Sequence, residues 1–488
     1  MSLPVVIVHY HLRRGGVTRV IECTSSCLSK GGVPHVILSS TPAESGRKLP
    51  VRVVEELGYD HPPGGGSSGL QLAHTLRQAA QQALGTSKFV WHLHNHSLGK
   101  NRHLSDAAGI LAVSGDPMVL QYHDFAEDGR PGAYPAIADS DTLYPYAPQI
   151  LHAFINSRDR GCLVGAGLPE NLTCLHPNAI TPPARVKPPA KPPRHPLVLY
   201  PVRGIRRKNL GELFLLATLA PAGTRFAVSL PPSSPQPYHS HAEWKAFAAD
   251  TGLPVILEAV GHVSPRPKAP RTYASWVRHS THFITTSVAE GFGLGFLEPA
   301  TIGKPLLGRN LPMLTDDFAR AGITPGRLYD RLLVPESWVG LETLRQRLVR
   351  SMRATLERYG HPMSNQHLEK SFAAMRHRGH LDFGNLPEDL QRQVIHRLLA
   401  GTDHDLVLAE VRGETRPLSE WLARTLANPE PTVSPEQLAP FSPAAYLERL
   451  REIYARVVEA APESPFFLPK HKVLDRFLQP GSFHFLRS

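Results

Sequence analysis

Short apolar runs alternate with longer amphipathic stretches along most of the chain, a pattern that predicts alternating strands and helices. The first forty residues show it: an apolar run at Val5–Val8 precedes a Gly15-Gly16 break, a helical stripe and a second run at His35–Leu38. The stripe consists of Val17, Val20, Ile21 and Leu28. A strand, a helix and a strand in this order predict a βαβ unit, and hence a parallel sheet with helices on its faces.

The same alternation continues on both sides of a proline-rich basic segment at residues 182–196. Before it, we predict strands at Phe89–Leu93, Gly109–Val113, Met118–Gln121, Ala153–Ile155 and Leu172–Leu175. After it, we predict strands at Leu197–Val202, Phe226–Leu230, Val255–Leu257, His282–Thr285 and Pro305–Leu307. Because such a proline density favours an extended, semi-rigid spacer, the segment is interpreted as a linker between an α/β lobe at residues 1–181 and a second at 197–365.

The C-terminal part of the chain has a different pattern. Beyond about Pro362 the strand and helix alternation ends, and the apolar spacing predicts helices over Leu381–Leu399 and Tyr446–Val458. Residues 366–488 are therefore expected to form a mainly helical extension. In the second lobe, a helix after the first strand is predicted from Asn209, with Glu212 completing a capping box.

The composition narrows the class of partner. Lys and Arg number 53 against 42 Asp and Glu, a net charge of +11 that favours phosphates, nucleic acid or an acidic membrane surface. The apolar runs, such as Leu213–Ala217, fall far short of the roughly 20 residues that span a bilayer, and the N-terminus lacks a signal-peptide pattern. Four cysteines without a CxxC pair predict neither a disulfide framework nor a zinc knuckle, and a reducing cytoplasm is the expected setting.

The strongest chemical signal is the segment TTSVAEGFGLGFLEPATIGKP, at residues 285–305. A strand runs into the glycine-rich loop Glu290-Gly291-Phe292-Gly293, which opens a helix over Leu294–Ile302, and Glu298 follows eight residues after the first carboxylate. Backbone amides at such a helix start favour a diphosphate, while carboxylates accept hydrogen bonds from sugar and ribose hydroxyls. The pattern therefore fits a sugar nucleotide; an ordinary strand-to-helix turn with a solvated Glu298 is the alternative.

A second signal follows the first strand of the same lobe. Arg203 and Lys208 lie between that strand and a helix, where ligands of open α/β sheets bind, outside the carboxyl ends of the strands. Two cations there suit a leaving diphosphate. Arg206 and Arg207 compete for the role, and a solvated basic turn is the alternative.

The first lobe carries two weaker signals. Gly15 and Gly16 follow its first strand and allow a close backbone approach by a ligand. His123 and Asp124 end a later strand, where a histidine can bind a sugar hydroxyl or transfer a proton, or be a structural residue only.

Three alternating histidines are candidate metal ligands. His92, His94 and His96 alternate, so the pattern places all three on one side of a strand. Because no fourth ligand follows at a diagnostic spacing, no metal site is predicted.

Taken together, these residues resemble the family-four retaining glycosyltransferases, which have the GT-B fold of two Rossmann-like lobes facing a central cleft. The matching segments extend over roughly residues 3–310. They are the Gly15-Gly16 loop, His123-Asp124, FINSRDR, CLHPNAI, the Arg203…Lys208 pair, and EGFGLGFLE with its two glutamates.

The resemblance implies transfer of a sugar from a nucleoside diphosphate sugar to an acceptor hydroxyl, with retained anomeric configuration, no metal and no other cofactor. By it, His123 and Glu290 are the expected catalytic residues, and Glu298 binds the ribose. Asp124 lies on the acceptor side. Residues expected to bind the donor diphosphate are Gly15, Gly16, Arg203, Lys208, Gly291, Phe292 and Gly293. In GT-B proteins the chain often returns to the first lobe through a terminal helix, for which Tyr446–Val458 is the candidate.

Other classes of function remain open at this point. A basic nucleic-acid-binding or scaffold protein fits the +11 charge, but no aromatic-rich binding module is present and nucleic acid is not expected as a partner. A GT-B-type epimerase or phosphorylase would use the same cleft. An acidic membrane surface near a lipid-linked acceptor is a further candidate partner.

Overall fold

The structure is a computed structural model that describes residues 3–44, 48–59, 68–181, 193–232, 238–261, 272–401 and 403–487. The chain divides into two compact units. The first unit comprises Met1–Ala179, Ala354–Pro362 and Pro440–Gln479; the second comprises Ile180–Arg353, Met363–Ala439 and Pro480–Ser488. The segment 182–192, most of the expected linker, lies outside the described residues.

The first unit is built on a parallel seven-stranded sheet in the order β3-β2-β1-β4-β5-β7-β8. Its strands are β1 (Val5–Val8), β2 (His35–Ser39), β3 (Val51–Val53), β4 (Val90–His94), β5 (Met118–Tyr122), β7 (Ile150–Phe154) and β8 (Thr173–Leu175). In β1, Val6 and Val8 pack into one core while Val5 and Ile7 pack into another. This alternation buries the strand on both faces, as a parallel sheet covered by helices requires.

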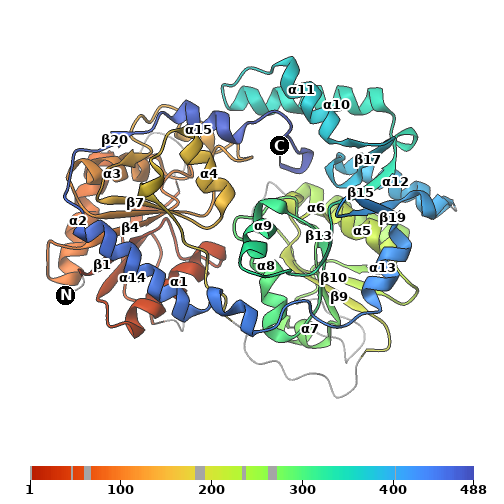
Figure 1. Cartoon of the computed structure of the whole chain (residues 1–488), viewed down its shortest axis with the longest axis horizontal. Helices are drawn as coiled ribbons and strands as arrows, with labels where there is room; N and C mark the ends of the chain where they lie inside the picture. The colour runs from red at the N-terminus through yellow and green to blue at the C-terminus, as the bar shows by residue number, and fades with distance from the viewer. Residues whose placement is uncertain are drawn as a thin grey trace. The chain divides into compact units, whose positions relative to one another are not determined.

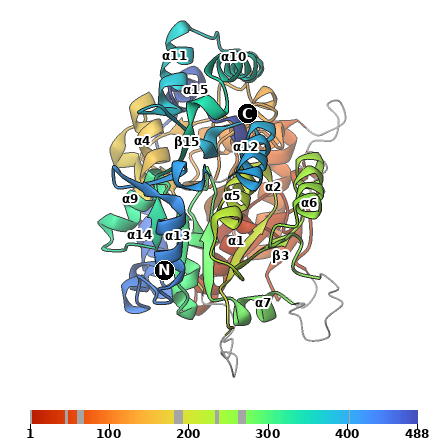
Figure 2. The same cartoon turned by 90° about the vertical axis from the view of Figure 1, so that its right-hand side faces the viewer.

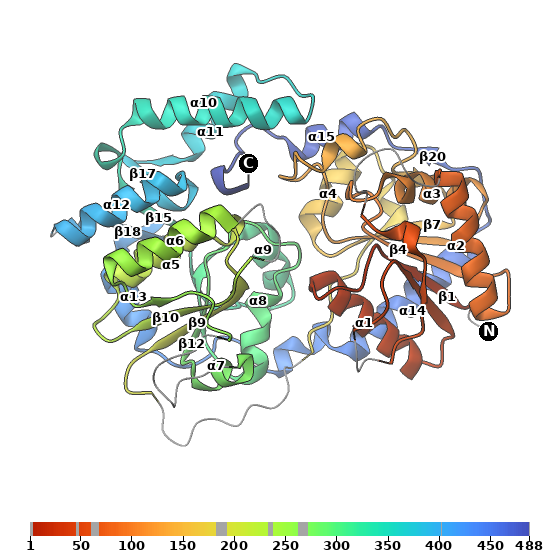
Figure 3. The same cartoon turned by 180° about the vertical axis from the view of Figure 1, so that it is seen from behind.

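Helices cover both faces of that sheet. They are α1 (Gly16–Lys30), α2 (Gly69–Leu84), α3 (Arg102–Val113), α4 (Ser157–Ala166), α14 (Pro443–Glu459) and α15 (Lys470–Phe477). The late helix α14 lies beside α1, and the hydroxyls of Thr24 and Tyr446 meet at 2.8 Å (Figure 1). On the other face, α2 packs against α3 (Figure 3). A two-stranded pairing of β20 (Phe466–Phe467) with β6 (Pro145–Tyr146) also ties the late segment to the first unit.

The second unit contains a parallel six-stranded sheet in the order β11-β10-β9-β12-β13-β14. Its strands are β9 (Leu197–Arg203), β10 (Arg225–Leu230), β11 (Val255–Ile256), β12 (His282–Thr285), β13 (Leu306–Arg309) and β14 (Arg327–Tyr329). Its helices include α5 (Leu210–Leu219), α6 (Tyr238–Thr251), α7 (Tyr273–His279), α8 (Leu294–Leu297) and α9 (Pro312–Arg320). Helices α5 and α6 pack together, with the Phe214 and Trp244 rings stacked at 4.9 Å (Figure 3).

Residues beyond the second sheet build more than helices. Besides α10 (Leu341–Arg358), α11 (Asn365–Ala374), α12 (Glu388–Ala400) and α13 (Leu418–Leu426), they form an antiparallel sheet ordered β16-β17-β15-β18-β19. Its strands are β15 (Arg331–Pro335), β16 (Arg376–His377), β17 (His380–Asp382), β18 (Leu408–Val411) and β19 (Glu414–Pro417). Helix α12 packs on α5 (Figure 2). The helix expected over Leu381–Leu399 is therefore wrong at its start, because β17 occupies that position.

Two further expectations are wrong. Gly109–Val113 is not a strand but the end of α3, whose buried face includes Leu104 and Ala108. Asn209 does precede α5, but its side chain makes no capping hydrogen bond and its φ is +49°. Glu212 is instead fully buried and ion-paired with Arg309, which also bonds Asp382 at 2.6 Å. The Glu212 side chain thus forms a tertiary ion pair with Arg309 instead of the local capping interaction.

Candidate functional site

The candidate donor residues of the second unit gather where its sheet changes direction. From β9 the chain goes to β10 and β11 on one side, then crosses to β12, β13 and β14 on the other. The reversal lies between β9 and β12, which are hydrogen-bonded neighbours. Ligands of open α/β sheets bind at such a switch point, outside the carboxyl ends of the strands.

Lys208 and Glu290 meet at this switch point. Lys208 lies in a 3-10 turn (Arg206–Lys208) after β9, and Glu290 lies in the loop after β12. The Lys208 Nζ donates to Glu290 Oε1, although the two residues are 82 positions apart. Their side chains are only 11% and 18% exposed, so solvent screens the pair weakly.

Polar groups beneath the pair hold both loops in place. The Ser287 hydroxyl donates to Glu290 Oε1 at 2.6 Å and lies 2.6 Å from the Tyr200 hydroxyl. The Thr286 hydroxyl donates to the Lys208 carbonyl at 2.8 Å. The two loops therefore form one hydrogen-bonded structure, and the TTS segment at the end of β12 supplies most of its side-chain bonds.

The electrostatic balance keeps Glu290 ionised. Burial acts to raise the pKa of its carboxyl, but the charges of Lys208 and Arg207 and the bonds from Lys208 and Ser287 outweigh burial and lower it. A charged carboxylate can accept hydrogen bonds from hydroxyls, and the neighbouring ammonium keeps further N–H groups that can donate to a phosphate.

The conformation of the glycine-rich loop requires a glycine at position 293. Gly293 adopts φ +77° at the start of α8, and a Cβ there would lie 2.9 Å from both Leu314 Cδ1 and Phe296 Cδ2. Phe292 is buried edge-on against Phe318 at 5.9 Å, so its side chain anchors the loop. Gly291 precedes it and is half-buried.

Arg203 and Glu298 belong to the same unit as the pair. Arg203 ends β9, is half-buried, and donates from Nη1 to the Pro231 carbonyl at 3.4 Å. Glu298 begins a 3-10 turn over Glu298–Ile302 directly after α8, and its carbonyl accepts from the Thr301 hydroxyl at 2.6 Å. The helix predicted over Leu294–Ile302 is thus α-helical only in its first half, because Pro299 follows Glu298.

In the first unit, Gly15 and Gly16 also lie at a switch point, between β1 and β4. Gly15 precedes α1 and Gly16 is its first residue; a Cβ on Gly16 would meet no atom within 4 Å. Both glycines are exposed, and neither adds a side chain of its own at the start of α1.

His123 and Asp124 follow β5, the neighbour of β4. The His123 ring is buried, its Nε2 lies 2.9 Å from His94 Nδ1, and burial lowers its pKa to about 4. Asp124 is ion-paired with Arg130. A neutral imidazole at this position can exchange a hydrogen bond with a sugar hydroxyl.

Asn95 positions both residues and was not identified from the sequence. It adopts φ +57° directly after β4, and its Oδ1 accepts from the backbone amides of His123 at 2.7 Å and Asp124 at 3.2 Å. The Tyr10 hydroxyl holds the Asn95 carbonyl at 2.6 Å. Asparagine tolerates the left-handed conformation, but no spacing in the sequence signals such a long-range contact.

The three alternating histidines do not share a face. His92 and His94 stack at 4.4 Å, and His92 Nδ1 lies 2.8 Å from the Tyr454 hydroxyl of α14. His96 comes after the Asn95 turn and bonds the Leu143 carbonyl at 2.9 Å instead. The turn redirects the chain, so strand alternation ends at His94; within the described residues no group of three or more His, Cys, Asp or Glu is arranged to hold a metal.

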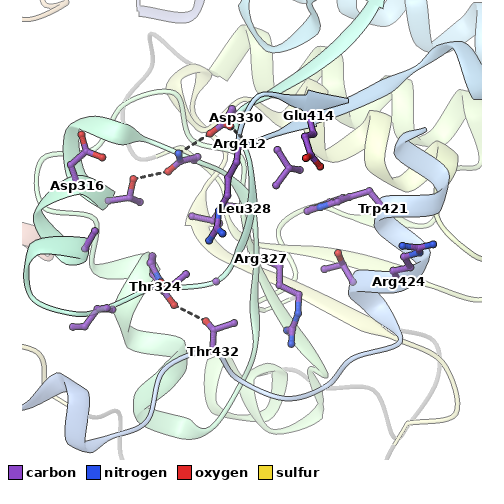
Figure 4. Close-up of a pocket in the computed structure, with 18 of the residues that line it drawn as sticks. Asp316, Thr324, Arg327, Leu328, Asp330, Arg412, Glu414, Trp421, Arg424 and Thr432 are labelled. Atoms are coloured by element: carbon purple, nitrogen blue, oxygen red, sulfur yellow. Dashed lines mark hydrogen bonds between the residues drawn. The ribbon is translucent and has the colours of Figure 1, made fainter. Parts of the chain in front are cut away.

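A hollow of about 820 Å³ lies elsewhere in the second unit, along the edge strand β14 (Figure 4). Helices α9 and α13 and the β18–β19 hairpin complete its walls, with Trp421, Arg327 and Arg412 among its lining residues. None of the predicted donor residues lines it. It is thus separate from the Lys208–Glu290 pair.

The chain is similar to known glycosyltransferases. Mannosylglucosyl-3-phosphoglycerate synthase of Petrotoga mobilis is 26% identical over 427 residues, which is 79% of each chain. The solved structure of sucrose-phosphate synthase from Thermosynechococcus elongatus superposes with a TM-score of 0.53 at 14% identity, covering 94% of this chain and 100% of that one. A glycosyltransferase from Rickettsia africae gives a TM-score of 0.51 at 13% identity, with coverage of 94% and 100%. No protein-family model matches the chain.

These similarities confirm the fold class expected from the sequence, two Rossmann-like α/β units of GT-B type. They also confirm the expected class of enzyme, a retaining glycosyltransferase that uses a nucleotide sugar and an acceptor. No described helix is long and apolar enough to cross a membrane. The roles of individual site residues stay predictions.

Proposed function

We propose that this GT-B glycosyltransferase, similar to the family-four retaining enzymes, transfers a hexosyl group to a phosphorylated acceptor and holds its donor through the Lys208–Glu290 pair. The contact between these two side chains carries the proposal. It joins a cation suited to a diphosphate and a carboxylate suited to a sugar at the switch point of the second unit.

The residues of the second unit bind different parts of the donor. Lys208, with Arg203, neutralises the negative charge that grows on the departing diphosphate. Glu290 accepts hydrogen bonds from the transferred sugar, and Glu298 accepts them from the ribose. The amides around Gly291, Phe292 and Gly293 bind the diphosphate.

His123 and Asp124 serve the sugar and the acceptor. His123 is neutral near pH 7, since burial lowers its pKa to about 4, and it bonds a sugar hydroxyl without adding charge. Asp124, held by Arg130, lies on the acceptor side.

The similarity to the Petrotoga mobilis enzyme favours one acceptor class, a glucoside of 3-phosphoglycerate, with mannose as the sugar transferred. Such an acceptor also agrees with the +11 charge of the chain. Peripheral binding to an acidic membrane surface is a second explanation of the positive net charge. Cosedimentation with phosphatidylglycerol vesicles measures it directly.

The test is a transfer assay with a panel of nucleoside diphosphate hexoses and phosphorylated acceptors. We expect nucleoside diphosphate release that depends on the acceptor, and a product whose anomeric proton signal, read by NMR, has the configuration of the donor. Turnover without an acceptor-linked sugar, or an inverted product, contradicts the proposal.

A further inference from the structure

A cluster of cations lies at the carboxyl edge of the first-unit sheet. It is contributed by three connections: Arg13 follows β1, Lys100 follows β4 and Arg130 follows β5. These strands are consecutive in the sheet, so the connections emerge side by side at the switch point.

Tyr59 lies beside this cluster. Its ring centroid is 4.9 Å from that of His11 and 5.7 Å from Lys100 Nζ. The charges of Arg13, Asp124 and Arg130 all act on its hydroxyl, whose pKa is raised chiefly by burial. Lys100 thus lies over one aromatic side chain, which offers both a flat face and a hydrogen-bonding group that the charges of Arg13 and Arg130 also reach.

The positive charge of the cluster is only partly neutralised. Arg130 is paired with Asp124. Among the described residues, no carboxylate forms an ion pair with Arg13 or Lys100, and both side chains reach solvent. Burial and the neighbouring charge of Arg130 lower the pKa of Lys100.

The backbone around these cations is fixed. The Thr18 hydroxyl donates to the Arg13 carbonyl at 2.6 Å. Asn101, next to Lys100, donates from Nδ2 to the carbonyls of Glu56 and Gly58 at 2.7 Å each, which ties the segment leading to Tyr59 to the start of α3. These bonds hold the backbone next to Arg13, Lys100 and Tyr59 in place.

We infer that Arg13, Lys100 and Arg130, with Tyr59, bind the anionic group of the acceptor, a phosphate or carboxylate. The inference rests on the proposed function, and deepens it by placing the acceptor's negative charge on the first unit. Asp124, the residue expected on the acceptor side, is already part of the cluster through Arg130.

The experiment compares Lys100→Gln and Arg13→Gln with Lys88→Gln as the matched control. Lys88 is exposed and precedes β4, so it carries the same charge at the opposite edge of the same sheet. Binding of 3-phosphoglycerate, glycerate and inorganic phosphate is measured by calorimetry, and transfer kinetics are measured with the glucoside of glycerate, with and without its phosphate.

Losing one charged hydrogen bond to the anion is expected to weaken 3-phosphoglycerate binding and raise the acceptor KM about 10- to 100-fold in the two cluster variants. The control variant and nucleoside diphosphate affinity should match wild type. If the variants bind glycerate and 3-phosphoglycerate more weakly by the same factor, the bound group is the carboxylate. If only the binding of ligands that carry a phosphate is weaker, the bound group is the phosphate.

Wild-type affinities in both cluster variants, or wild-type protein that binds none of the three anions, overturn the inference. Anion binding that depends on Lys100, in a chain that transfers no sugar from any donor, contradicts the proposed function and leaves the anion site standing.

Discussion

The coupling of Lys208 to Glu290 gives the sharpest mutational prediction. Lys208→Gln removes the ammonium from a carboxylate whose side chain is 18% exposed, and leaves it with the more distant charge of Arg207 and the Ser287 hydroxyl. Removing one preorganised group that stabilises transition-state charge lowers kcat by roughly 10²- to 10³-fold. We expect losses of that size for Lys208→Gln and for Glu290→Gln.

The double variant distinguishes a functional unit from two independent residues. If the pair acts together, Lys208→Gln/Glu290→Gln loses about as much as either single variant, whereas independent contributions would multiply to about 10⁴- to 10⁶-fold. Initial rates at saturating donor and acceptor measure this, with circular dichroism to confirm folding. Lys245→Gln is the control, since it breaks an exposed pair with Glu258 in the same unit and should leave the rate unchanged. Multiplicative losses, or full activity in both single variants, would refute the assignment.

Three further predictions concern stability. Arg309→Met should lower the free energy of unfolding of the second unit by about 3–5 kcal/mol in urea titrations, because it strands the buried Glu212 and Asp382 carboxylates; a loss under 1 kcal/mol would contradict this. Burial lowers the pKa of His92 to about 4 in the folded state, so as the pH drops from about 6.5 towards 4 the unfolded state binds a proton that the folded state does not, and the free energy of unfolding falls. His92→Gln should therefore reduce the difference in the free energy of unfolding between pH 7 and pH 5 by about 2 kcal/mol. An unchanged difference would contradict this. Gly293→Ala, at φ +77° and 2.9 Å from Leu314, should cost about 1–2 kcal/mol and lower the transfer rate, outcomes that a thermal melt and the transfer assay check.

Local signals in the sequence predicted most strands of the parallel sheets, but not β3 or β14. The apolar runs Val5–Val8 and Leu197–Val202 lie within observed strands, because strands buried on both faces need continuous apolar residues. The glycine loop could also be predicted from local sequence, because Gly293 adopts a positive φ that residues other than glycine rarely reach.

The parts that the sequence did not reveal depend on contacts between distant residues. Glu212 fits a capping box by spacing, yet Arg309, 97 residues away, binds it. Strands β16 to β19 are two to four residues long, too short for a period-two pattern to stand out from helical spacing. Asn95 and the cations around Tyr59 meet only because parallel strands bring their connections to one edge.

The most direct test of the account is a calorimetric titration of the purified chain with nucleoside diphosphates, repeated on Lys208→Gln. We expect one nucleotide per chain and an affinity at least about 10-fold weaker in the variant, since a charged bond to the diphosphate is lost. Absence of nucleotide binding to the wild-type chain, or equal affinities in the two proteins, would contradict the claim that Lys208 at the β9–β12 switch point holds the donor.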